Sequence, residues 1–193
     1  MERFLKAKHW QIFLLTFGLP YLLQAIVSYF LFSDENPLKF MKIMPFIMVF
    51  MISGILGWFW AVAIKLQSKI PAEVKMKVRK FKIFFFIPLI YILFILGSFG
   101  FMFTNVLQNG QLPSGISMGL SMLIIFPLHL FSMFCIMYSF YFAAKTFKTV
   151  ELQREVEFSD FAGEFFLFWF FPIGIWVVQP KINKMIELYA EKK

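Results

Sequence analysis

One stretch decides the class of this fold: Phe165-Phe-Leu-Phe-Trp-Phe-Phe-Pro-Ile-Gly-Ile-Trp-Val-Val178. As a helix, these residues would extend about 21 Å, which is short of the roughly 30 Å hydrocarbon core of a bilayer. Pro172 and Gly174 interrupt even that helix, because proline lacks a backbone N–H and glycine is a poor helix former. The stretch is too apolar for water. We therefore expect a re-entrant or interfacial helical hairpin.

Four longer apolar runs precede this stretch, and each is long enough to cross a bilayer as a helix. The chain is 60% hydrophobic and only 16% charged, so little of its 193 residues remains for a soluble domain. We predict an all-α integral membrane protein with a single membrane domain. Its predicted parts are spans at about 10–32, 43–64, 83–104 and 116–144, a linker at about 145–160, a hairpin at about 161–179 and a tail at 180–193.

The positions of Lys and Arg predict the orientation, because cytoplasmic loops are enriched in these residues. If the hairpin returns to the side it came from, 17 of the 19 basic residues lie on one side of the membrane. If it crosses, the division is 13 against 6. The first arrangement agrees better with the rule. We expect a multi-pass protein of the bacterial inner membrane with both termini in the cytoplasm.

Small residues at a spacing of four predict close helix packing in two of the spans. Gly115 and Gly119 form one G-x-x-x-G pattern, and Ser53, Gly57 and Ala61 form a second stripe. The first pattern also matches G-x-S-x-G, which carries the nucleophilic serine of many hydrolases. The nearest intramembrane histidine is about 18 Å away along the same helix, so it cannot act as the base within one copy. Packing is the better interpretation.

His129 is the one ionisable side chain, tyrosines aside, well inside a predicted span. Such groups indicate functional sites, but a neutral imidazole with a hydrogen-bond partner is also a structural element. Gln24 lies at a similar depth in an antiparallel span and is one available partner. The carbonyl of Leu123, which Pro127 leaves without its helical hydrogen bond, is another. A proton or substrate path at this level stays open as the alternative.

Polar residues flank the predicted hairpin. Asp160 and Glu164 precede it with i, i+4 spacing, which places both carboxylates on one helix face. Gln179 and Asn183 follow it with the same spacing. Paired carboxylates bind metals or transfer protons, although an ion-paired solvated face is the commoner reason for such acidic clusters. We interpret these four residues as structural caps of the hairpin or as a contact site for a partner.

The end of the chain contains three distinctive runs: Gly163-Glu-Phe-Phe166, Phe171-Pro-Ile-Gly-Ile-Trp176 and Gln179-Pro-Lys-Ile-Asn183. With these runs it resembles the tail of an uncharacterised family of small bacterial four-span membrane proteins. The resemblance implies that the tail is a module, and it implies no activity. By size and hydropathy alone, the chain also resembles small multi-span proteins encoded beside RNA-targeting CRISPR effectors.

These patterns favour a non-enzymatic membrane protein that associates with itself as an assembly, regulatory or pore-forming subunit. An accessory role in a defence system is one form that this function could take. The alternatives are a small channel or transporter at the level of His129 and Gln24, and a membrane enzyme acting on lipid or peptide. The expected partners are membrane lipid and either further copies of the chain or another membrane protein. The basic residues flank spans instead of forming a stripe, which argues against nucleic acid. With Cys135 as its one cysteine, the chain lacks the pattern of a metal or cofactor site.

Overall fold

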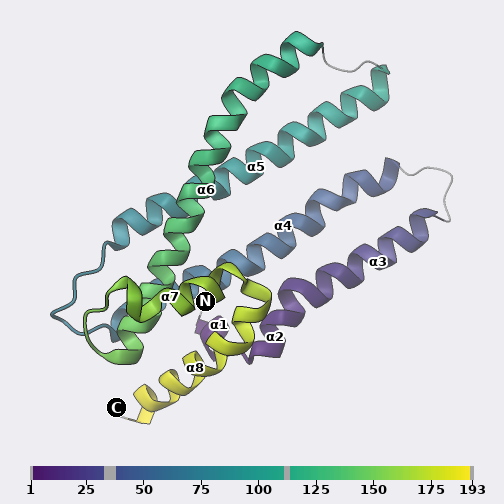
Figure 1. Ribbon diagram of the computed structural model, residues 1–193. Helices are drawn as coiled ribbons and strands as arrows, with labels where there is room; N and C mark the ends of the chain where they lie inside the picture. Colours follow the sequence, from purple (N-terminus) through teal and green to yellow (C-terminus); the bar gives the residue numbers. More distant parts are fainter. Residues whose placement is uncertain (1, 33–37, 111–113, 192–193) are drawn as a thin grey trace. The chain divides into compact units, whose positions relative to one another are not determined.

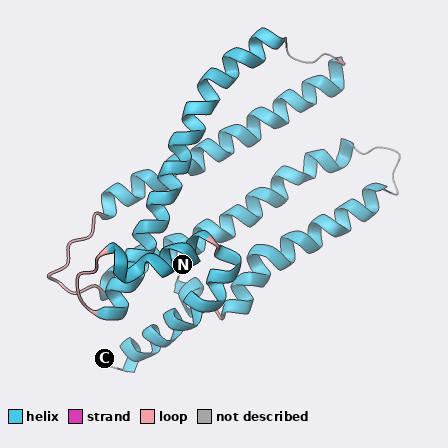
Figure 2. Ribbon diagram, viewed as in Figure 1, coloured by secondary structure: helices cyan, strands magenta, loops and turns pink. Residues whose placement is uncertain are grey.

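The computed structural model describes residues 2–32, 38–110 and 114–191. Helices and loops account for all of these residues, and no strand occurs among them (Figure 2). Residues 192 and 193 of the predicted tail lie outside the described ranges.

Four segments of the described chain are long and apolar enough to cross a membrane: His9–Phe30, Ile43–Lys69, Val78–Val106 and Met118–Leu152. The chain is therefore an all-α, multi-pass membrane protein, as the sequence predicts. Two segments continue past their predicted ends, to Lys69 and Leu152. A helix satisfies its own backbone hydrogen bonds, so it need not end where the side chains become polar.

The chain divides into two compact units. Unit 1 comprises the described parts of residues 1–76 and 140–193, and unit 2 comprises residues 77–139. The long helix α6 is continuous (Figure 1), and the boundary between the two units falls within it. The elements, in chain order, are α1 (Glu2–Lys6), α2 (His9–Phe13), the π-helical turn η1 (Leu14–Gly18), α3 (Leu19–Phe32), α4 (Leu38–Trp60), the π-helical turn η2 (Ala61–Lys65), the 3₁₀ turn η3 (Leu66–Lys69), α5 (Val78–Asn109), α6 (Gly115–Leu152), α7 (Phe158–Trp169) and α8 (Phe171–Glu191).

In unit 1, α4 packs closely on the first span and on the N-terminal segment. A Cβ added to Gly54 would lie 3.1 Å from Cγ2 of Thr16, and one added to Gly57 would lie 3.3 Å from the ring of Phe4. Ala61 is fully buried. Ser53 is exposed, and its hydroxyl donates to the carbonyl of Phe50 in its own helix. The small-residue face of α4 thus includes Gly54, which the spacing of four does not predict.

The C-terminal hairpin consists of α7 and α8, joined at Phe170. The turn therefore lies two residues before Pro172, which occupies the first turn of α8, where a missing N–H breaks no helical hydrogen bond. A Cβ at Gly174 would lie 1.7 Å from the carbonyl oxygen of Leu167, so only glycine permits this close approach of the two helices. α8 continues through the predicted tail to Glu191.

An aromatic core holds the hairpin on α4. Trp58 is buried, and its ring centroid lies 5.2 Å from those of both Phe168 in α7 and Phe171 in α8. Phe59 contacts the same two rings at 5.5 and 5.8 Å. The side chains on either side of the turn are thus fixed by one pair of residues in the second span.

Unit 2 is built differently, from α5 and the first part of α6. The two helices meet through large side chains, such as Phe84, whose centroid lies 6.1 Å from that of Phe134 and 4.9 Å from that of Tyr138. The ammonium of Lys80 lies 5.0 Å from the Tyr138 centroid. At the other end of α5, Gly110 adopts a left-handed φ of 64°, a conformation that glycine adopts without strain.

Candidate functional site

The polar residues after the hairpin turn form a group that we term the amide clamp: Gln179 and Asn183 of α8, Trp58 of α4, and the backbone of residues 4–7. Gln179 is fully buried. Its Oε1 accepts a 2.7 Å hydrogen bond from Nε1 of Trp58. Its Nε2 donates to the carbonyl oxygens of Phe4, Leu5 and Ala7 at 3.1, 3.1 and 2.8 Å.

These carbonyls need an outside partner because α1 ends at Lys6. The last carbonyls of a helix have no donor within it. Asn183 lies one helical turn beyond Gln179 on the same face of α8, and its Nδ2 donates to Leu5 and Ala7 at 2.9 and 3.2 Å. The two amides therefore complete the end of α1 and tie the N-terminal segment to α8.

Next to the clamp, four charged side chains from three helices form an ion cluster: Lys148 and Glu151 of α6, Glu164 of α7 and Lys181 of α8. Nζ of Lys148 lies 2.7 Å from Glu151 and 3.0 Å from Glu164. Nζ of Lys181 lies 3.6 and 3.5 Å from the same two carboxylates. Two positive and two negative charges balance, so the cluster holds its helices together without net charge.

Glu164 is the most buried carboxylate of the cluster, with 8% of its surface exposed. Burial alone would raise its pKa. The hydrogen bond from Lys148 and the positive charges of Lys148 and Lys181 outweigh burial, so the pKa of Glu164 lies below its ordinary value. Glu164 is therefore held as a carboxylate, in the role of a structural anion.

Asp160 lies on the same helix as Glu164 but has a different partner. The guanidinium of Arg154 donates two hydrogen bonds to its carboxylate, at 2.9 and 3.1 Å, and the backbone N–H of Glu157 donates a third at 3.0 Å. The bonds from Arg154 and Glu157 hold the pKa of Asp160 below its ordinary value. The two acids are thus engaged with separate cations and do not form a proton-sharing pair.

In unit 2, His129 contacts Tyr91 of α5. The hydroxyl of Tyr91 lies 3.1 Å from Nδ1 of His129. Tyr91 is buried, whereas His129 is exposed. Gln24 lies in α3 of unit 1 and is half-buried, and its contact with His129 stays a prediction.

The glycines at the start of α6 have open space beside them. Within the described part of the chain, a Cβ at Gly115 or Gly119 would meet no atom within 4 Å. The pattern that predicts helix packing therefore does not pack against the described residues of its own chain.

Some residues of these groups carry no signal in the sequence. Trp58 and Tyr91 are examples, because their partners lie 121 and 38 residues away in the chain. Lys148 and Glu151 carry a local signal, since i, i+3 spacing places them on one helix face. Across the described ranges, no group of three or more His, Cys, Asp or Glu side chains is arranged to hold a metal ion.

Comparison of the chain with family models, with curated proteins and with solved structures finds no match.

Proposed function

We propose that the chain is a non-enzymatic protein of the bacterial inner membrane that associates with further copies of itself through α6. Unit 1 is the structural module, closed by the hairpin, and α6 supplies the contact between copies. One observation carries the proposal: an exposed stripe of residues on α6 has the spacing of a helix–helix interface.

The α6 stripe consists of six residues: Gly115, Gly119, Met122, Phe126, His129 and Met133. They follow one another at spacings of four, three, four, three and four, the pattern of interacting helices. At 3.6 residues per turn, all of them lie within about 40° of one line along the helix. All six are exposed, Met122 and Phe126 by 60 and 64%.

The other face of α6 provides a contrast. Ser132 and Cys135 are buried, at 2 and 0% exposure, and lie on the side away from the stripe. α6 is therefore covered at Ser132 and Cys135, whereas nearer its start the side opposite the stripe is exposed as well, as at Ile124. Lipid covers an apolar face at no cost, so exposure alone does not require a protein partner.

The composition of the stripe favours a protein partner over lipid. Two glycines allow a second backbone to approach closely, which increases the packing contacts between helices in a bilayer. Nδ1 of His129 lies beside the Tyr91 hydroxyl, so it is the other ring nitrogen that would cost free energy in hydrocarbon unless it finds a hydrogen bond. In a symmetric pair of α6 helices, the stripe of one copy faces the same residues of the other.

The contacts of the amide clamp support the proposed orientation. They bring the part of α8 that contains Gln179 and Asn183 beside residues 4–7 in unit 1. This agrees with termini that share one side of the membrane, and the positive-inside rule then makes that side the cytoplasm.

Cysteine cross-linking in native membranes tests the proposal, in a background where Cys135 is replaced by alanine. We expect Met122→Cys and Met133→Cys to form disulfide-linked dimers. Ile124→Cys is the matched control, because Ile124 is 70% exposed but lies on the opposite side of α6. Equal cross-linking at Met122 and Ile124, or none at either stripe position, would show that the stripe is not the interface.

The hydrogen bond between Tyr91 and His129 favours a second candidate, a small channel or transporter that uses this polar pair. Purified protein in liposomes would then conduct protons or a small solute, and His129→Ala would abolish the flux. Absence of flux across a broad panel of solutes would remove this candidate and leave self-association unaffected.

A further inference from the structure

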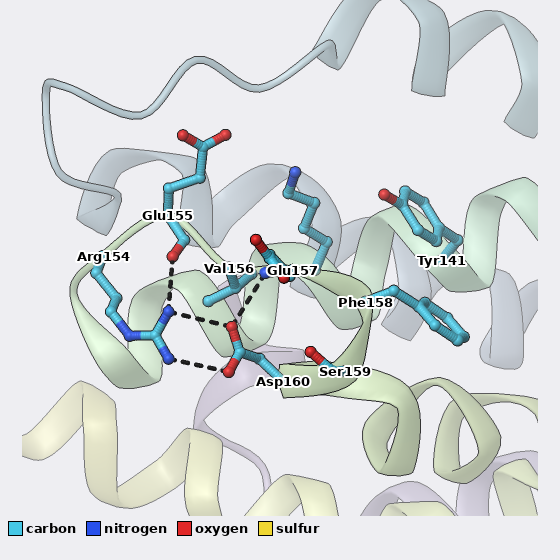
Figure 3. A pocket seen from close by; sticks show the side chains of 9 residues that line it. Tyr141, Arg154, Glu155, Val156, Glu157, Phe158, Ser159 and Asp160 are labelled. Atoms are coloured by element: carbon cyan, nitrogen blue, oxygen red, sulfur yellow. Dashed lines mark hydrogen bonds and ion pairs between the residues drawn. The ribbon is translucent and has the colours of Figure 1, made fainter.

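Unit 1 contains a pocket that neither the clamp nor the ion cluster uses. Its volume is about 680 Å³, within the range of small-ligand sites. It lies between the end of α6, the loop that follows and the start of α7 (Figure 3). The lining residues are Tyr141, Lys145, Arg154, Glu155, Val156, Glu157, Phe158, Ser159 and Asp160.

One side of the pocket is preformed by local bonds. Arg154 binds Asp160 through both guanidinium nitrogens, and it also donates to the carbonyl of Glu155 at 3.0 Å. Val156 is 2% exposed and anchors the loop in the core. The charges of Arg154 and Asp160 neutralise each other, so they shape the wall and leave ligand binding to other groups.

Three charged groups remain. Among the described residues, Lys145 has no ion-pair or hydrogen-bond partner for its half-buried ammonium. Glu155 and Glu157 are exposed and line the same pocket. The pocket therefore offers one free cation together with two carboxylates, a combination that matches a ligand with both an anionic and a cationic group.

The opposite side is aromatic. The rings of Tyr141 and Phe158 stack at 15° with centroids 6.3 Å apart, and Figure 3 shows them on the side away from the Arg154–Asp160 pair. Tyr141 and Lys145 lie near the end of the span Met118–Leu152. Tyrosines are enriched at such membrane–water boundaries, so the pocket is accessible to lipid headgroups.

We propose that this pocket binds the phosphoethanolamine headgroup of a membrane lipid. Lys145 binds the phosphate, Glu155 and Glu157 accept hydrogen bonds from the primary ammonium, and the Tyr141–Phe158 side receives the glycerol end. This site is independent of self-association through α6.

The charges disfavour other common headgroups. With Lys145 and Arg154 against Glu155, Glu157 and Asp160, the lining carries a formal charge of −1, so an anionic lipid without an ammonium faces repulsion. A choline headgroup is cationic but has no N–H to donate, whereas a primary ammonium has three. Hydrogen bonds to the glutamates therefore select ethanolamine over choline.

Native mass spectrometry of the full chain tests this assignment, in detergent micelles with equal amounts of phosphatidylethanolamine, phosphatidylcholine and phosphatidylglycerol. We expect the protein to retain the ethanolamine lipid about tenfold better than the other two. Lys145→Gln and Glu157→Gln should each lower this retention about tenfold, because each removes a charge-assisted hydrogen bond. Lys184→Gln, at an exposed position of α8 outside the pocket, should leave it unchanged.

Several results would overturn the proposal: no retained lipid, equal retention of the three lipids, or the same retention in Lys145→Gln as in Lys184→Gln. Glu155→Gln changes an exposed loop side chain, so it provides a further test if another pocket variant fails to fold. Soluble O-phosphoethanolamine carries the same headgroup without the acyl chains. It therefore tests whether the pocket binds a membrane lipid or the free compound. Displacement of the lipid by an equal concentration of the soluble compound would overturn the assignment to a membrane lipid.

Discussion

We term the amide clamp and the ion cluster of unit 1 together the hairpin base. Its polar groups are bonded within the chain, whereas those of the α6 stripe in unit 2 are largely exposed. In the hairpin base, Gln179 makes four hydrogen bonds and Glu164 contacts two lysines, all within the chain. On the stripe, His129 has one ring nitrogen beside Tyr91 and is otherwise exposed. The polar groups of the first region are bonded within a single copy, whereas the second region would be covered by the proposed contact between copies.

The second and fourth spans also differ in how much of each is buried within the chain. In the most apolar window of Ile43–Lys69, 39% of the residues are buried, against 11% for Met118–Leu152. The second span is therefore held by the rest of its own unit, and α6 is largely left to lipid or to another copy. If this contrast is correct, substitutions in the hairpin base reduce the stability of one copy, and substitutions on the stripe change association.

The largest expected effect is at the hairpin turn. Gly174→Val places a Cβ 1.7 Å from the carbonyl oxygen of Leu167, so the helices must separate. We expect a loss of about 4 kcal/mol or more in unfolding free energy, measured by thermal unfolding in detergent. Gly163→Ala is the control, because a Cβ there meets nothing within 4 Å and alanine favours the helix. Similar stability of the two variants would disprove the close approach.

The amide clamp comes next. Gln179→Leu removes the hydrogen-bond partner of the indole N–H of Trp58 and of the carbonyl of Phe4, which we expect to cost about 3 kcal/mol. Asn183→Leu should cost only about 1 kcal/mol, because Gln179 still donates to both carbonyls that Asn183 binds. The same thermal measurement compares them, and a larger effect at Asn183 would contradict the described division of bonds.

The ion cluster predicts a pH dependence. The pKa of Glu164 is lower in the folded state than its ordinary value of 4.5, so its contribution to stability is present above that value. The contribution is lost as the pH falls through the lowered folded-state pKa. Glu164→Gln should cost about 2 kcal/mol at pH 7 and reduce the decline of the unfolding temperature in acid. Glu187→Gln, at an exposed position of α8, should leave the acid decline as it is in the wild type.

The smallest effect is expected in unit 2. Tyr91→Phe removes the hydroxyl that contacts His129, and single hydrogen bonds between membrane helices contribute about 0.6 kcal/mol. Thermal unfolding should therefore hardly change. A loss as large as that of Gln179→Leu would mean that unit 2 depends on its internal polar contact as strongly as unit 1 does.

Much of the fold is readable from the sequence because apolar length is a direct property of consecutive residues. The four spans and the helical hairpin follow from it. The position of the turn at Phe170 does not follow from the sequence. Pro172 and Gly174 mark the region, but Pro172 lies in the first turn of α8 and Gly174 allows the close approach to Leu167. The sequence also does not predict the amide clamp, because Gln179 and its carbonyl partners lie more than 170 residues apart. The suggested family and the orientation stay predictions.

The copy number of the purified protein in mild detergent, measured by native mass spectrometry, tests the central claim most directly. Self-association through the stripe predicts a dimer or larger particle for the wild type. It also predicts a folded monomer for the double variant Gly115→Leu and Gly119→Leu, because two large side chains hold the α6 helices apart. A strictly monomeric wild type, or the same oligomer in the double variant, would contradict it.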